Sequence, residues 1–193
     1  MGNLLRYHIY SSDQFDNAED ILALKKSLNN VTTLHYRGWR MSSSADDVII
    51  RKMNSILGNN LSKLCLKNYW QNLQSVLDIF ENFKSTLKEF NFFWCKPDDN
   101  FIDSLSEIEG LNLTSVRLIA CEDMTDARLK KLVESQKNIR ELEFTCCYKL
   151  TDDAIIMIYE NLPSLQSLRI FKCLRITNVS YCIQVLNFFV LIF

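Results

Sequence analysis

A repeat with a period of 26 residues constrains this 193-residue chain more than any other feature. Each copy has apolar residues at its first, fourth and sixth places and a Cys or an aromatic residue at its ninth place. The clearest copies begin at Leu61, Leu87, Leu113, Ile139 and Leu165. A further copy begins at Val31, and a weaker, partial one begins at Leu5. Such a period indicates stacked supersecondary units, each of which buries its apolar face against its neighbours.

The second half of each copy predicts a helix. Thr125-Asp126 and Thr151-Asp152 follow their ninth-place Cys at the same distance, and Thr177-Asn178 repeats the signal. Thr is a favoured helix N-cap, and an Asp in the first turn complements the positive end of the helix dipole. Apolar residues then recur at helical spacing: Leu129, Leu132 and Val133 in one copy, and Ile155, Ile158 and Tyr159 in the next.

Strand–helix units of this kind predict an α/β leucine-rich-repeat horseshoe solenoid. A strand takes about 4.8 Å of stacking width and a helix about 10 Å, so the stack curves, with strands on the concave face and helices on the convex face. Right-handed crossovers make the sheet parallel. We expect a single domain over residues 1–193 with about six to seven repeats: a degenerate first repeat or cap over 1–30, clear repeats over 31–177, and an irregular end over 178–193.

Charge and cysteine content exclude several classes of protein. The formal net charge is −1, which argues against binding to nucleic acid or to an anionic membrane through net charge. The seven Cys are odd in number, no CxxC occurs, and the N-terminus has no signal-peptide-like apolar segment. We therefore expect reduced thiols and a cytoplasmic or nuclear location. No stretch reaches the eighteen or so apolar residues of a membrane-spanning helix.

The ninth-place residues predict a buried row beneath the strand-to-helix turns. Cys is a small hydrophobe with a weak donor and suits such a place. A metal site would require thiolates that converge tetrahedrally, whereas these thiols lie in a row with one per unit, so no metal is expected. The row consists of Trp39, Tyr69, Cys95, Cys121, Cys147 and Cys173.

The third, fifth and seventh places of each strand are predicted to face outward on the concave side of the sheet. They combine basic and acidic side chains with exposed Phe, Ile and a neighbouring Trp, which is typical of protein interfaces. The alternative is a solvated sheet face with incidental ion pairs, each of little energetic value. The predicted partner-binding residues are Arg37, Lys63, Lys67, Phe93, Trp94, Arg117, Ile119, Glu143, Arg169 and Phe171.

One group of residues on this face has the composition of a cysteine hydrolase. His35, Cys65 and Asn91 share the fifth place on three successive strands. In such an enzyme the base lies between the nucleophile and the orienting residue, whereas here Cys65 is in the middle. A mid-strand position also offers no helix N-terminus or glycine turn as an oxyanion hole. We therefore predict no catalytic residues.

The pattern LxxLxLxxC, followed by Thr-Asp and a helix, resembles the cysteine-containing class of leucine-rich repeat. That class is typical of F-box/leucine-rich-repeat proteins, the substrate receptors of Skp–cullin–F-box (SCF) ubiquitin ligases. The resemblance covers Val31 to Thr177 and implies a ribonuclease-inhibitor-like fold. It also implies a non-catalytic module without a cofactor, which binds a protein substrate on its concave face.

The F-box itself is absent from the thirty residues that precede the first clear repeat. The chain therefore looks like the repeat portion alone, and a Skp–cullin partner is expected only if an F-box lies upstream. The alternative is a free-standing repeat scaffold or a truncated isoform with no ubiquitin-ligase link.

The C-terminal end departs from the period. The next strand is expected to begin at Leu191, two residues before the end, and the segment 187–193 carries no charge. A solenoid needs a polar terminal unit, and an uncharged sheet edge promotes aggregation. We therefore predict self-association through the C-terminal end, or a natural continuation into further repeats.

Overall fold

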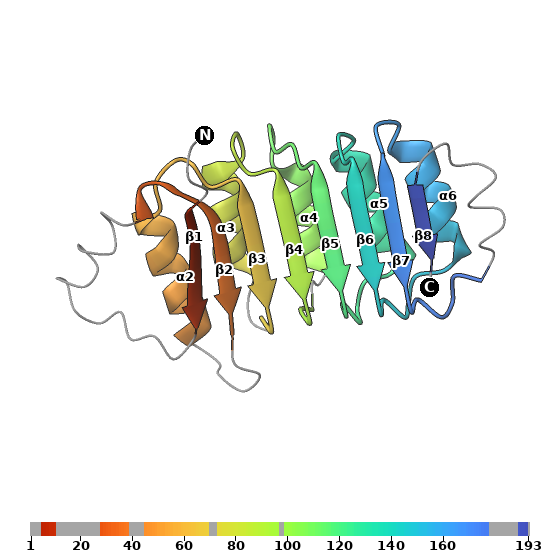
Figure 1. Cartoon of the computed structure of the whole chain (residues 1–193), viewed down its shortest axis with the longest axis horizontal. Coiled ribbons are helices and arrows are strands. Elements are labelled where there is room, and N and C mark those ends of the chain that lie inside the picture. Colours follow the sequence, from red (N-terminus) through yellow and green to blue (C-terminus); the bar gives the residue numbers. More distant parts are fainter. Residues whose placement is uncertain are drawn as a thin grey trace.

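The computed structural model describes residues 5–10, 28–38, 45–69, 73–96, 99–177 and 189–192. In these residues strands and helices alternate along most of the chain (Figure 1). The strands are β1 (Leu5–Tyr10), β2 (Val31–Arg37), β3 (Lys63–Lys67), β4 (Glu89–Phe93), β5 (Ser115–Ile119), β6 (Glu141–Thr145), β7 (Ser167–Phe171) and β8 (Phe189–Ile192). The helices are α2 (Ala45–Ile56), α3 (Gln74–Phe83), α4 (Asp99–Glu107), α5 (Asp126–Ser135) and α6 (Asp152–Asn161).

All eight strands form one open parallel sheet whose spatial order is the order of the sequence. From β3 to β7, residues that share a place in the repeat are paired across the sheet. Phe90, for example, pairs with Leu64 on one side and with Val116 on the other. This register follows from the repeat itself, because a shift by one residue would turn every apolar side chain away from the core.

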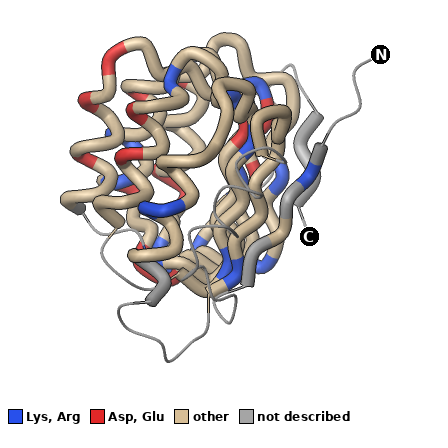
Figure 2. The backbone as a smooth tube through the Cα atoms, turned by 90° about the vertical axis from the view of Figure 1, so that its left-hand side faces the viewer, with Lys and Arg blue, Asp and Glu red and all other residues tan. Residues whose placement is uncertain are grey.

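The chain forms two layers, with the helices covering one face of the sheet (Figure 2). The core lies between the layers and consists of the apolar strand places and the inner faces of the helices; Leu61, Leu64 and Leu66 are fully buried. The predicted leucine-rich-repeat solenoid is thus confirmed. The opposite face of the sheet, at the third, fifth and seventh places, is called the open face below. None of the helices in the described part of the chain has the length and apolar character needed to cross a bilayer.

Each strand from β3 to β7 ends in the same left-handed turn. The eighth-place residues have φ between 52° and 55°, although none of them is glycine: Asn68, Trp94, Ala120, Cys146 and Lys172. At the first four of these places, the backbone N–H donates to the seventh-place carbonyl of the following unit, as from Ala120 to Thr145 at 2.7 Å. The turn therefore extends the backbone pairing of the sheet by one residue beyond each of these four strands.

The Thr-Asp pairs have a second role that the sequence did not indicate. Thr125 and Thr151 are N-caps as predicted, with side chains that accept from backbone N–H groups. In addition, Asp126 accepts two hydrogen bonds from the next unit, from the backbone N–H of Thr151 at 2.9 Å and from its hydroxyl at 2.6 Å. Asp152 binds Thr177 in the same way, at 2.7 and 2.9 Å. We call these contacts the Thr–Asp links.

Helix α6 differs from α5 in its packing at one position. Leu129, Leu132 and Val133 of α5 are buried as predicted, and so are Ile155 and Ile158 of α6. Tyr159 occupies the place of Val133 in the repeat, but 51% of it is exposed. The buried face of α6 is instead shifted toward Ala154, whose small side chain allows the helix to approach the core.

The C-terminal tail forms strand β8, which pairs with β7. The offset between these strands is 22 residues, because Ser167 faces Phe189, so the strand comes earlier than the period predicts. The edge of β7 is therefore covered by backbone pairing. Residues 178–188 lie outside the described residues, and self-association through this end stays a prediction.

Candidate functional site

The ninth-place row is buried, as far as it is described. Tyr69, Cys95, Cys121 and Cys147 are fully buried and Cys173 is 5% exposed, whereas Trp39 lies outside the described residues. The thiols donate to strand carbonyls: Cys147 to Leu118 of the preceding unit at 3.3 Å, and Cys95 to Leu66 at 3.6 Å. The row thus ties neighbouring units together. No group of three or more His, Cys, Asp or Glu in the described part of the chain is arranged to hold a metal ion.

Burial should make the thiols of Cys95, Cys121 and Cys147 unreactive. It raises the pKa of Cys95 to about 12 and also raises the pKa of Cys121. The hydrogen bond with Cys173 raises the pKa of Cys147, and burial raises it further. Cys146 is half-buried at the turn. Under native conditions we expect iodoacetamide to modify Cys146 at least about a hundredfold faster than Cys95, as followed by peptide mass spectrometry, with similar rates in urea. Comparable native rates would show that the row is accessible.

The open face carries the predicted partner-binding residues over β2 to β7. Lys63, Lys67, Phe93 and Ile119 are half-buried, and Arg37 is exposed. Two large apolar side chains stand out further, since Trp94 and Phe171 are each 39% exposed. Trp94 projects from the left-handed eighth place rather than from the strand, and the Lys67 ammonium lies 4.8 Å from its ring centroid.

Glu143 holds the C-terminal half of the open face together. Its carboxylate lies 3.6 Å from Arg117 on β5 and 3.6 Å from Arg169 on β7, so one acidic group bridges two basic neighbours. Arg117 also approaches Glu141 at 3.9 Å. Beside this network, the Lys172 ammonium lies 5.1 Å from the ring centroid of Phe171. This half of the face is therefore mixed in charge, with an aromatic side chain at its edge.

Several short side chains on the open face are buried, contrary to the predicted outward exposure. Thr33, Cys65, Asn91 and Ser115 are between 3% and 6% exposed. Their longer neighbours cover them, and at the third place Lys63 forms an ion pair with Glu89 across the strands. Alternation decides which face a side chain is on, but the length of its neighbours decides whether solvent reaches it.

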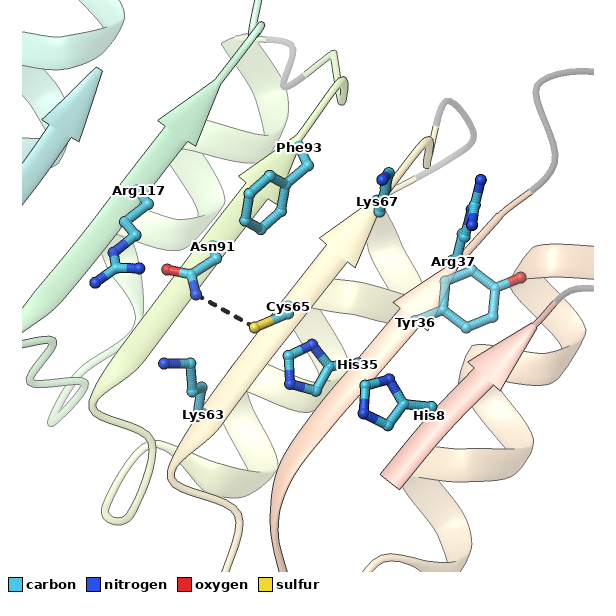
Figure 3. A pocket seen from close by; sticks show the side chains of 10 residues that line it. All are labelled: His8, His35, Tyr36, Arg37, Lys63, Cys65, Lys67, Asn91, Phe93 and Arg117. Carbon is cyan, nitrogen blue, oxygen red and sulfur yellow. Dashed lines mark hydrogen bonds between the residues drawn. The ribbon is translucent and has the colours of Figure 1, made fainter. Parts of the chain in front are cut away.

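A pocket of about 400 Å³ opens on the N-terminal half of this face, over β1 to β5 (Figure 3). Cys65 and Asn91 lie at its floor, where the Asn91 amide nitrogen donates to the Cys65 sulfur at 3.2 Å. The amide oxygen of Asn91, Oδ1, is buried without a hydrogen-bond partner and faces away from Cys65, toward Arg117. The pocket thus contains an unsatisfied acceptor.

Basic side chains and two histidines surround this floor. The rings of His8 and His35 are stacked, with centroids 4.6 Å apart and planes 8° from parallel. Burial lowers the pKa of His35, and His8, Lys63 and Arg6 lower it further. Of the residues described, none of those that line the pocket carries a carboxylate. The pocket is therefore positively charged at one end of a chain whose net charge is −1.

The His35–Cys65–Asn91 group has the order expected from the sequence. Cys65 lies between the two residues, paired in register with His35 and with Asn91. Burial raises the pKa of the Cys65 thiol, although the Asn91 hydrogen bond counteracts this in part. A thiol with a raised pKa is a poor nucleophile, and Asn91 contacts the sulfur rather than orienting the histidine. The geometry argues against hydrolase chemistry at this place.

Two parts of the surface were not predicted from the sequence. His8 belongs to the pocket because the pairing shifts between Leu5 and Arg6, which brings His8 opposite His35; the weak copy at Leu5 did not reveal this shift. Tyr148 and Leu174 follow the ninth-place Cys of two successive units and are 44% and 75% exposed. Both residues directly follow a ninth-place Cys, and this shared place in the repeat could have indicated that they are exposed.

Comparisons with known proteins support the fold. No family model matches the chain, and no curated protein matches it. Among solved structures, it is similar to a chain in the crystal structure of the Rad7 and Elc1 complex from yeast, with a TM-score of 0.57 and 20% sequence identity. The match covers 90% of this chain and 46% of the yeast chain, so the present chain spans about half the length of that relative.

Proposed function

We propose that this chain is a non-catalytic protein-interaction module whose open face binds a protein partner. The observation that carries the proposal is a sheet face that none of the described helices covers, with exposed aromatic side chains at Trp94 and Phe171 and with the Arg117–Glu143–Arg169 network. Exposed aromatic residues next to arginine are typical of interface hot spots, whereas a solvated sheet face rarely retains them. The likeness to a chain solved in a protein complex agrees with this role.

The more specific proposal is substrate recognition for SCF-type, ubiquitin-dependent degradation, in the cytoplasm or nucleus. It rests on the cysteine-containing repeat and its resemblance to F-box/leucine-rich-repeat proteins. The alternative is a repeat scaffold without a ligase link. Reading the transcript upstream of Met1 tests the two proposals: an encoded F-box favours the ligase receptor, and its absence favours the scaffold.

Alanine substitutions on the two faces test where the partner binds. We expect a triple alanine variant of Phe93, Arg117 and Phe171 to co-purify with at least about tenfold less partner than the wild-type chain. The reason is that hot-spot truncations each cost more than about 1 kcal/mol of binding free energy. The matched control replaces one cation and two exposed apolar residues on the helices: Lys130, Ile156 and Tyr159. Quantitative mass spectrometry of co-purified proteins is the measurement, on variants that retain the wild-type circular dichroism spectrum.

The opposite result would place the interface elsewhere. If the helix variant loses the partners and the open-face variant keeps them, the open face is not the binding surface. Ile156 and Tyr159, which are 42% and 51% exposed, would then mark it.

A further inference from the structure

The pocket over β1 to β5 holds two like charges that lie opposite one another and have no counter-ion within the described part of the chain. Arg37 and Lys67 are register partners at the seventh place of β2 and β3. Among the described residues, neither has a carboxylate within 4 Å. By contrast, Lys63 and Arg117 in the same pocket are paired with Glu89 and Glu143. Like charges directly opposite on a sheet are destabilising, so an anion beside Arg37 and Lys67 would relieve a cost that the free protein carries.

The floor of the pocket requires a different kind of group. Asn91 is 3% exposed, and its Oδ1 has no donor. A buried acceptor without a partner destabilises the free chain, and an N–H donor that reaches it would recover this free energy. A simple anion brings no such donor, whereas a peptide backbone does. Phe93, half-buried at the seventh place next to Lys67, adds an apolar wall.

We propose, on the basis of the proposed function, that this pocket binds an acidic peptide segment of the protein partner. Carboxylates of the segment lie beside Arg37 and Lys67, and one of its backbone N–H groups donates to Oδ1 of Asn91 once the longer side chains that cover this atom move aside. About 400 Å³ holds a few residues of extended peptide, and its lining offers cations together with a few placed polar groups. The pocket would therefore select acidic sequences, and the rest of the open face would contact the remainder of the partner.

Fluorescence anisotropy with labelled hexaglutamate tests the charge contacts on the full chain. We expect hexaglutamate to bind and hexaglutamine not to. Replacing Arg37 and Lys67 with Gln should weaken binding by about tenfold or more. The matched control replaces Arg169 and Lys172 with Gln, which removes the same charge from the other end of the open face, and should change affinity by less than about twofold. Equal weakening by both pairs, or no binding of hexaglutamate, would overturn the proposal.

A thermodynamic cycle that combines a modified peptide with a protein variant tests the contact with Asn91. Backbone N-methylation of hexaglutamate removes its N–H donors and is expected to weaken binding to the wild-type chain by about fivefold or more. Asn91→Leu keeps the side-chain size but removes the acceptor, so N-methylation should have little effect on that variant. Equal weakening in both proteins would show that no N–H bonds to Asn91. A folded Asn91→Leu chain, verified by circular dichroism, is required, and the charge pairs test the proposal independently.

The two histidines predict a pH dependence. His35 faces Arg6 and His8 from β1 and Lys63 and Cys65 from β3, and Arg37 lies on its own strand. Burial lowers its pKa in the free chain, and His8, Lys63 and Arg6 lower it further. A bound carboxylate would raise this pKa, so binding takes up a proton. Affinity should therefore rise as the pH falls from about 8 to about 6, and His35→Gln should remove most of this rise. A pH-independent affinity in the wild type would contradict a carboxylate next to His35.

These outcomes are separate from those of the face-mapping experiment. If natural partners depend on Phe93, Arg117 and Phe171 but hexaglutamate does not bind, the open face still binds protein and the acidic-peptide assignment is wrong. If hexaglutamate binds at Arg37 and Lys67 but no partner depends on the open face, the pocket stands and the proposed function fails.

Discussion

Replacing Asp126 with alanine is expected to lower the free energy of unfolding by about 2–4 kcal/mol, because it removes both hydrogen bonds of one Thr–Asp link. Asp126 accepts from the backbone N–H and the hydroxyl of Thr151 at 2.9 and 2.6 Å. Hydrogen bonds to an ionised acceptor are the stronger kind, and the substitution would leave the N–H of Thr151 without its partner. The loss falls on the contact between two units rather than within one helix.

Urea unfolding followed by circular dichroism measures this change. The matched control is Asp153→Ala, which removes an exposed carboxylate from the first turn of α6 and should change stability by no more than about 0.5 kcal/mol. Asp126→Asn keeps one oxygen acceptor without the charge and should fall between the two. If Asp126→Ala costs no more than Asp153→Ala, the Thr–Asp link does not stabilise the stack.

Replacing Phe80 with alanine should cost about 3–5 kcal/mol, the range for truncating a buried aromatic residue. Phe80 is fully buried on α3, and its ring meets Phe90 edge-on at 4.6 Å and Phe101 at 6.3 Å. Phe92 continues the cluster to both Phe90 and Phe101. Two successive units contribute these rings, Phe80 from one and the other three from the next, so a cavity at Phe80 would weaken the contact between the two units.

The same urea experiment provides the comparison. Phe171→Ala makes the same chemical change at a side chain that is 39% exposed at the end of β7, and should alter stability by no more than about 0.5 kcal/mol. A loss at Phe80 similar to that at Phe171 would show that the aromatic cluster relaxes to fill the space.

The sheet and its register could be predicted from the sequence because both follow from spacing. Leu64, Phe90, Val116 and Leu142 occupy the same place in successive copies, and the structure pairs them side by side. The buried Cys row could be predicted for the same reason. In each case the property belongs to one place in the unit and repeats with it.

The features that could not be predicted depend on contacts between units or on the side chains that surround a residue. The link from Asp126 to Thr151 joins residues 25 positions apart and requires the helix starts of two units to lie in contact. The burial of Asn91 depends on how the longer side chains around it lie, which spacing does not reveal. His8 entered the pocket through an irregularity in the pairing of β1. The burial of Asn91 and the position of His8 both shaped the candidate site.

The sheet keeps its pairing although the units differ in length. Leu34 and Leu64 are partners 30 residues apart, Leu64 and Phe90 are 26 apart, and Leu168 and Val190 are 22 apart. Extra or missing residues are therefore absorbed outside the strands, where long insertions cost little. Gene duplication or loss of one complete unit would leave every remaining strand a matching neighbour. A duplication or deletion with an end inside a strand would leave that strand without a matching neighbour. This architecture therefore permits evolutionary growth and shortening in whole units, and the open face lengthens or shortens by one strand each time.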